Sequence, residues 1–129
     1  MKTLSLTLGP VQTNTYIVAD LETNEAVVID PSWDGATIAK TTEEQGWQIK
    51  AIWLTHAHFD HIGGVADLVK SLPEEIPIYL HPDDYELYKS GGSAARFGIH
   101  IEPGPEPLPL EHGQLLHVGK YAFEARHTP

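Results

Sequence analysis

The chain has 129 residues, which is the size of one domain. Eighteen acidic residues against eight lysines and arginines give a formal net charge of −10, which argues against nucleic acid or an acidic membrane as a partner. The absence of cysteine excludes disulfides and thiolate metal sites.

The N-terminal segment MKTLSLTLGPVQTN has one lysine, and polar residues interrupt its apolar ones. We therefore predict neither a signal peptide nor a membrane span. The absence of cysteine fits a reducing compartment, so we expect a cytoplasmic protein.

Three short strands are predicted first, over Leu4–Leu8, Thr15–Asp20 and Ala26–Asp30, because these segments are rich in β-branched and aromatic residues. The polar turn Glu22–Glu25 predicts that the second and third strands form a hairpin. A helix is predicted over Asp34–Gly46, with its first residue as N-cap and its final glycine just beyond the last turn.

The middle of the chain alternates strands and helices. Ile49–Thr55 is a fairly continuous apolar run of strand length, typical of a strand buried on both faces. His61–Leu72 has helical spacing of its apolar residues, Ile76–His81 is the next predicted strand, and Pro82–Ser90 is the next helix. This alternation predicts the α/β class, with a mixed sheet that is parallel in the middle.

The segment Gly91–Leu110 is rich in proline and glycine and is predicted to be a long irregular loop. Two last strands follow, over Gln114–Val118 and Tyr121–His127. The pair Gly119-Lys120 between them predicts a tight hairpin turn.

The stretch LTHAHFDHIGG places three histidines and one aspartate between a buried strand and a helix. Imidazole nitrogens and carboxylate oxygens are ligands of zinc, iron and manganese. His56 and His58 are two residues apart and can point the same way, whereas Asp60 and His61 can face a second point nearby. The spacing HxHxDH is expected by chance about twice in a thousand chains of this composition, so it predicts one or two metal positions.

Two glycines, Gly63 and Gly64, follow this stretch and would let the helix backbone approach its neighbours closely. Open α/β sheets bind ligands at this place, where strands end and helices begin.

The motif and its surroundings resemble the metallo-β-lactamase-fold hydrolases, and the small bacterial glyoxalase II-like (hydroxyacylglutathione hydrolase-like) members in particular. The resembling blocks are, in order, GPVQTNTYIV, VVIDP, AIWLTHAHFDHIGGVADL, IPIYLHPDD, GSAARFG and FEARHTP. The resemblance implies one domain over residues 1–129 that corresponds to the N-terminal half of an αββα sandwich. It therefore predicts an incomplete domain.

The resemblance also implies a role for each matched residue. Up to two zinc ions are expected, with iron or manganese as alternatives, and a water deprotonated by the metals would be the nucleophile. The acidic residue that ends VVID would lie close behind the metals and orient a ligand. The implied set is His56, His58 and His127 for the first metal, Asp60 and His61 for the second, Asp60 also as the catalytic residue, and Asp30 behind them.

The implied reaction is hydrolysis of a thioester such as S-lactoylglutathione, which this chain alone would perform weakly or not at all. Two alternatives stay open: a mononuclear iron persulfide dioxygenase, and a non-catalytic, self-associating metal-binding half-domain. A β-lactamase or a nuclease is less favoured. Without a second sheet, the apolar strands would expose a wide face, which predicts a homodimer.

Two residues depart from the family pattern: Thr15 stands where cysteine is frequent, and Ser32 stands where glycine is usual. We assign no function to either. The remaining candidates are expected to be structural or to lie at the surface. His81 is expected to have a structural role at a helix start, and the expected surface histidines are His100, His112 and His117. Two loop residues, Arg96 and Phe97, either face substrate or make plain loop contacts.

Overall fold

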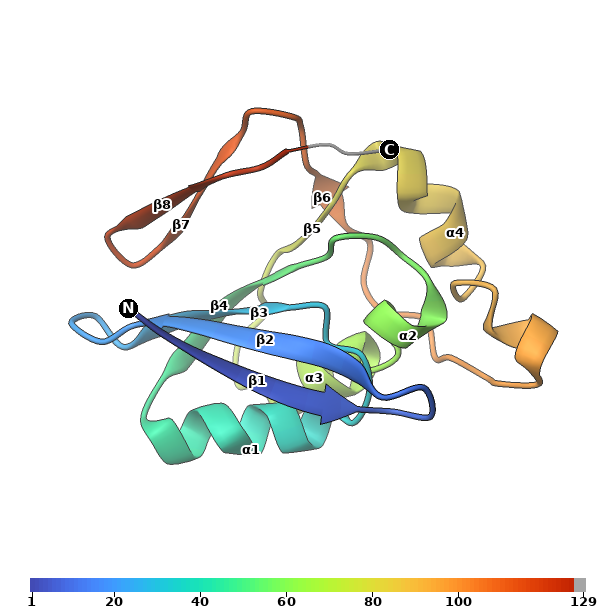
Figure 1. Ribbon diagram of the computed structural model, residues 1–129, viewed down its shortest axis with the longest axis horizontal. Coiled ribbons are helices and arrows are strands. Elements are labelled where there is room, and N and C mark those ends of the chain that lie inside the picture. Colours follow the sequence, from blue (N-terminus) through green and yellow to red (C-terminus); the bar gives the residue numbers. More distant parts are fainter. Residues whose placement is uncertain (127–129) are drawn as a thin grey trace.

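A computed structural model describes residues 1–126 as a twisted sheet with helices on one side and a hairpin on the other (Figure 1). In chain order its elements are β1 (Lys2–Leu8), β2 (Thr13–Asp20), β3 (Glu25–Ile29), α1 (Gly35–Gln45), β4 (Gln48–Trp53), α2 (Phe59–Ile62), α3 (Val65–Ser71), β5 (Ile78–Leu80), the 3₁₀ turn η1 (Pro82–Asp84), α4 (Tyr85–Lys89), η2 (Ala94–Phe97), β6 (Leu108–Pro109), β7 (Leu115–Val118) and β8 (Tyr121–Glu124).

The main sheet has the order β1-β2-β3-β4-β5-β6. The pairs β1–β2 and β2–β3 are antiparallel, because short turns join them. From β3 to β6 the strands are parallel, because each connection is long enough to cross over, the first of them through α1. The mixed α/β sheet and the hairpin of β2 with β3 are therefore confirmed.

The first helix ends where the sequence predicts. The Asp34 carboxylate accepts a hydrogen bond from Thr37 N at 3.4 Å, which is the role of an N-cap. Gly46 follows the last turn with φ 76°, in the left-handed conformation, and its N–H binds the Glu43 carbonyl.

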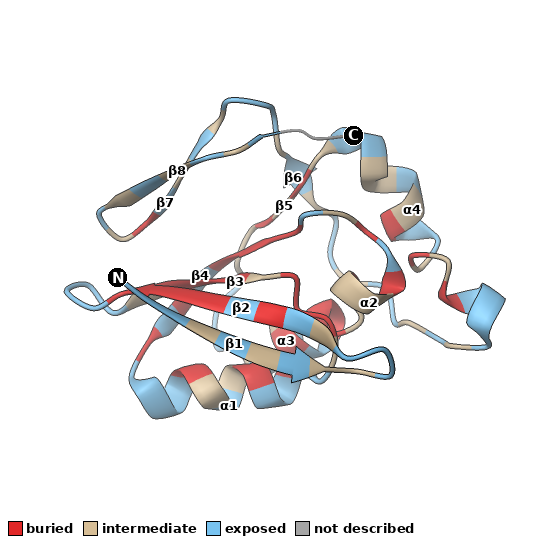
Figure 2. Cartoon of the chain, viewed as in Figure 1, coloured by how far each residue is buried: buried red, intermediate tan, exposed pale blue. Residues whose placement is uncertain are grey.

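One face of the sheet packs against α1 and α3. Ile17, Val28 and Ile52 of the central strands are fully buried against Ile38 of α1 and Leu68 of α3. Figure 2 shows this buried band running through β2, β3 and β4. The expected burial of the fourth strand on both faces is confirmed, because Ala51 and Trp53 face the opposite side and are buried there too.

The opposite face is covered by the chain itself, so the expectation of a wide exposed apolar face is wrong. The hairpin β7–β8 folds back over the sheet, and Val118 is buried against Val18 and Val27. Phe123 meets Trp53 edge to face, with ring centroids 5.5 Å apart. The sequence pattern predicted the hairpin but not where it packs.

A polar contact fixes the tip of this hairpin to the β2–β3 turn. The buried Asp20 carboxylate accepts a hydrogen bond from Lys120 N at 3.0 Å, and the Lys120 ammonium lies 2.6 Å from the Glu22 carboxylate. Gly119 has φ 54°, and a Cβ there would overlap the Asp20 carboxylate and the Thr23 hydroxyl. The tight turn therefore needs glycine for two independent reasons.

The predicted helix over residues 61–72 is two helices, α2 and α3, separated by Gly63 and Gly64. A Cβ at Gly63 would overlap the Trp33 ring, and one at Gly64 would press on the backbone of residues 31 and 33. The close approach expected of these glycines is confirmed, and the helix is interrupted at the same two residues.

Other predicted boundaries also shift. The helix expected over 82–90 begins as the 3₁₀ turn η1, and the loop 91–110 contains η2 and the short strand β6. Strand β8 ends at Glu124, and the predicted continuation to His127 reaches beyond the described residues. No helix among residues 1–126 is long and apolar enough to cross a membrane.

Candidate metal centre

The His-rich loop leaves β4 at the end where β3 also ends, which places Asp30 beside it. The two strands are parallel neighbours, and Asp30 N donates to the Trp53 carbonyl at 3.0 Å. The chain then passes through Thr55 and the histidines into α2. Parallel pairing therefore brings Asp30 to a motif that lies more than twenty residues away in sequence.

The Asp30 carboxylate is held by three donors. It accepts hydrogen bonds from Thr55 N at 2.8 Å, from the Thr55 hydroxyl at 2.5 Å and from His61 Nδ1 at 2.9 Å. Asp30 is 5% exposed and has φ 53°, a left-handed conformation that costs a non-glycine residue free energy. The surrounding contacts thus impose a strained backbone that points this carboxylate at His61.

His61 is oriented by that carboxylate. Because a carboxylate only accepts, Nδ1 of His61 is the donor, which leaves Nε2 facing Asp60 Oδ2 at 3.4 Å. The hydrogen bond to Asp30 raises the pKa of His61, although partial burial opposes this. A histidine whose Nδ1–H is taken by a carboxylate presents Nε2 in the orientation typical of metal-binding histidines.

His56 and His58 lie next to each other and next to His61. Their Nδ1 atoms are 3.2 Å apart, and the His56 ring centroid lies 3.8 Å from that of His61. Partial burial, followed by the neighbouring His61, lowers the pKa of His56 and favours its neutral, metal-binding form. Two nitrogens bound to one tetrahedral zinc at about 2.0–2.1 Å lie about 3.3 Å apart, so this spacing fits a shared ion.

The coordination shell itself is not assembled by the described side chains. Within residues 1–126, no group of three histidine, aspartate or glutamate side chains is arranged to hold a metal ion. The predicted third histidine, His127, lies outside the described residues. What fits a metal here is the donor set of imidazoles and carboxylates, with one imidazole oriented by a carboxylate.

Four contacts at this site were missed from the sequence, and each involves a small polar side chain or an acidic one. The Thr13 hydroxyl donates to Asp60 Oδ2 at 3.0 Å. Asp84 Oδ2 accepts from Ala57 N at 3.0 Å and holds the loop between the two histidines. Thr15 donates to the Asp30 carbonyl at 2.8 Å, and its hydroxyl lies 2.8 Å from that of Ser32.

The two departures from the family pattern are thus in contact with each other. Thr15 and Ser32 are buried, and Ser32 N also donates to the Thr15 hydroxyl at 3.0 Å. These bonds hold the turn after β3 against β2. Threonines at alternate positions of a strand beside Asp30 were the available signal, because alternate residues share one face.

The other histidines lie as expected. His81 Nδ1 accepts from Asp83 N at 3.1 Å at the start of η1, which is a structural role. His100, His112 and His117 are exposed. Phe97 is 67% exposed and its ring centroid lies 5.3 Å from that of Phe59, which follows His58 directly.

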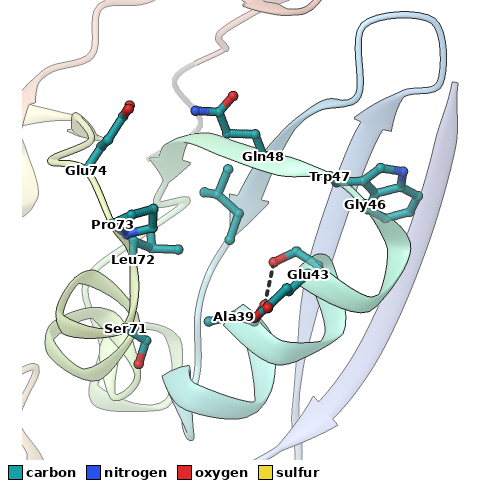
Figure 3. Close-up of a pocket in the computed structure, with 11 residues that line it drawn as sticks. Ala39, Glu43, Gly46, Trp47, Gln48, Ser71, Leu72, Pro73 and Glu74 are labelled. Atoms are coloured by element: carbon teal, nitrogen blue, oxygen red, sulfur yellow. Dashed lines mark hydrogen bonds between the residues drawn. The ribbon is translucent and has the colours of Figure 1, made fainter.

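A cavity of about 440 Å³ lies at the other end of β4 (Figure 3). It contains no histidine, and its two carboxylates, Glu43 and Glu74, come from α1 and from the loop after α3. We therefore place the chemistry at the His-rich loop and not in this cavity.

Comparison with known proteins gives consistent matches over nearly the whole chain. Residues 8–129 match the family model described as the metallo-beta-lactamase superfamily. The chain is 31% identical over 132 residues to a probable metallo-hydrolase of Bacillus subtilis, covering 100% of this chain and 61% of that protein. It is 29% identical over 120 residues to a hydroxyacylglutathione hydrolase of Haemophilus influenzae, covering 92% of this chain and 56% of that protein.

Solved structures agree. The protein TTHA1623, in a di-iron-bound form, has 40% identity and a TM-score of 0.82, with 98% of this chain and 61% of that chain covered. The B3 metallo-beta-lactamase BLEG-1 has 33% identity and a TM-score of 0.81, with 99% and 62% covered. The chain thus spans about three fifths of the length of these relatives.

Proposed function

Because the chain belongs to the metallo-beta-lactamase superfamily, we propose that it carries the metal-binding residues of a hydrolase that cleaves a thioester. The observation that supports this most directly is the hydrogen bond between Asp30 and His61, which orients the His61 imidazole beside that of His56. The relatives of this chain include metallo-hydrolases, which supports a hydrolase.

His56 and His58 would hold one metal together with His127, and Asp60 and His61 would contribute to a second. A metal bound there would supply a water of lowered pKa and would polarise the carbonyl of the substrate. Zinc is the proposed metal, with iron or manganese as alternatives, because a relative is named as a zinc-dependent hydrolase and a similar structure holds two iron ions.

The residues of the chain orient the ligands of this centre, and they favour the neutral form of one of them, His56. Asp30 holds the Nδ1 proton of His61, and Thr55 holds Asp30 through its N–H and its hydroxyl. Burial favours the neutral form of His56. These contacts preorganise the imidazoles, so less reorganisation is needed when a metal binds.

The thioester substrate rests on the similarity to hydroxyacylglutathione hydrolases, of Haemophilus influenzae over most of the chain and of Enterobacter over 58 residues at 43% identity. The similarity to a B3 metallo-beta-lactamase shows that proteins of this fold also include enzymes named for another substrate class, the β-lactams. The substrate of this chain is therefore part of the proposal.

The test is thiol release from S-lactoylglutathione by the purified 129-residue chain with added zinc. We expect weak release that depends on metal, is abolished by His58→Ala and is unchanged by His117→Ala, a control at an exposed position of β7. Equal release by the chain and by His58→Ala would contradict the proposal, as would hydrolysis of a β-lactam without thioester cleavage.

A second candidate is an iron-dependent persulfide dioxygenase, which the di-iron-bound form of a similar structure makes worth testing. Iron content and oxygen uptake with glutathione persulfide separate the two reactions. Oxygen uptake that follows iron content, without thioester cleavage, would favour the dioxygenase.

A further inference from the structure

A hydroxyl at the start of β2 reaches the Asp60 carboxylate. Thr13 Oγ1 donates to Asp60 Oδ2 at 3.0 Å across 47 residues of sequence. Because an ionised carboxylate only accepts, the threonine is the donor and the bond is charge-assisted. Asp60 itself sits in the single-turn helix α2, and its side chain is 27% exposed.

Thr13 is held more firmly than the carboxylate that it contacts. It pairs with Leu8 in the β1–β2 ladder, immediately after a tight turn in which Gln12 N donates to the Gly9 carbonyl at 3.2 Å. The Ser32 hydroxyl donates to the Thr13 carbonyl at 3.2 Å. Threonine is also β-branched and has few rotamers. The hydroxyl is therefore a fixed point against which Asp60 is oriented.

The contact selects one oxygen of Asp60. Oδ2 receives the Thr13 hydroxyl and also lies 3.4 Å from His61 Nε2. Oδ1 makes no hydrogen bond to the part of the chain that the structure describes. Among the contacts that residues 1–126 make, the carboxylate is thus held through Oδ2.

We propose that Thr13 is a positioning residue, which holds the Asp60 carboxylate in the orientation in which it binds a metal together with His61. This inference rests on the proposed metal centre and adds a residue to which no role has been given. The competing explanation is a purely structural bond that fastens α2 to β2. The two explanations differ in whether the effect of Thr13 on metal binding passes through Asp60.

The experiment is a titration of the metal-free chain with Co²⁺ and with Zn²⁺ against a chromophoric chelator, with the visible absorption of Co²⁺ as a second readout. Asp60→Ala defines the part of the binding curve that depends on Asp60. We expect Thr13→Val, which keeps size and branching, to weaken that part by about tenfold or more. Thr13→Ser, which keeps the hydroxyl, should restore it to within about twofold.

Thr42→Val is the matched control, because Thr42 is buried in α1 and its hydroxyl donates to the Ala39 carbonyl, away from the site. It should leave metal binding unchanged. In the double variant, Thr13→Val should add nothing to Asp60→Ala, because both changes remove one interaction. Circular dichroism checks that each variant is folded, and Thr13→Ala replaces Thr13→Val if the latter is not.

Three results would overturn the inference. If Thr13→Val binds metal as tightly as the unmodified chain while Asp60→Ala binds it more weakly, the positioning role is ruled out and the proposed function stays intact. A loss that persists in the Asp60→Ala background shows a structural role. An unmodified chain that binds neither metal contradicts the proposed function, and the role of Thr13 fails with it.

Discussion

The Asp30 carboxylate and the His61 imidazole meet at 2.9 Å between Oδ2 and Nδ1, although 31 residues separate them in sequence. The contact exists because β3 and β4 are parallel neighbours and both end at the same edge of the sheet. One strand supplies the carboxylate, and the other leads into the loop and helix that carry the histidine. The contact sets the tautomer of His61.

Asp30→Asn should weaken metal binding at the second site, to which His61 contributes, by about 10–100-fold, because the amide cannot accept from His61 and Thr55 as the carboxylate does. It should also lower the free energy of unfolding by about 1–3 kcal/mol, because buried donors lose a charged acceptor. Competition titration with zinc and chemical denaturation measure the two effects. Asp34→Asn, at the N-cap of α1, is the control, because asparagine caps helices equally well. Equal metal affinities in both variants would show that Asp30 does not orient a ligand.

The chain should hold about one metal ion tightly, because the first site has three predicted histidines and the second has only Asp60 and His61. His58→Ala and His127→Ala should each lower the tightly bound metal well below one ion per chain. His100→Ala changes an exposed loop histidine and should leave it unchanged. Elemental analysis after gel filtration gives the ratio. Two tightly held ions per monomer would contradict this prediction, and full binding by His127→Ala would remove that residue from the ligand set.

Acid should loosen the β7–β8 hairpin from the sheet. The hydrogen bond from Lys120 N lowers the pKa of Asp20 below its usual value near 3.8, helped by the N–H of Glu22 and the Lys120 charge and opposed by burial. Because the folded pKa is the lower one, the stabilisation is present above about pH 3.8 and is lost as the pH falls through the folded value.

Asp20→Ala should therefore lower the thermal unfolding midpoint at pH 7, and the difference from the unmodified chain should shrink as the pH falls below 3.8. Glu44→Ala, an exposed residue of α1, is the control. Differential scanning calorimetry from pH 3 to pH 7 gives both values. A difference that stays constant over this range would show that the Asp20 charge does not hold the hairpin.

Phe123→Ala should uncover the apolar face beneath the hairpin. It removes the edge-to-face contact with Trp53 and is expected to cost about 1–3 kcal/mol of folding free energy. Leu115→Ala, in the same hairpin, is the control, because the Leu115 side chain is 60% exposed and little burial is lost with it. Tryptophan fluorescence should shift to longer wavelength in Phe123→Ala alone.

The homodimer stays a prediction. Because the hairpin already covers Val18, Val27 and Trp53, less apolar surface is left for a partner than the sequence implied, and we expect a weak dimer. Sedimentation equilibrium over a range of concentrations measures it, and Phe123→Ala should associate more strongly than the unmodified chain. A monomeric mass for both proteins at every concentration would contradict the dimer.

The sequence by itself determined the fold class, the first helix with both of its ends, and the four residues of HxHxDH. These depend on local rules: the period of apolar residues, the capping preferences of Asp34 and Gly46, and the chemistry of side chains a few positions apart. The resemblance to a family added Asp30, whose carboxylate lies 2.9 Å from His61 Nδ1 in the structure.

Only the tertiary structure decided where the hairpin packs, where the helix after the motif breaks, and which hydroxyls hold the site. The hairpin lies over the sheet because its turn meets Asp20, a contact across 100 residues. The helix is interrupted at Gly63 and Gly64, where a side chain on either residue would overlap Trp33. Thr13 reaches Asp60 only because strand pairing brings the start of β2 beside α2. Such contacts depend on the packing of distant segments, which no local pattern in the sequence specifies.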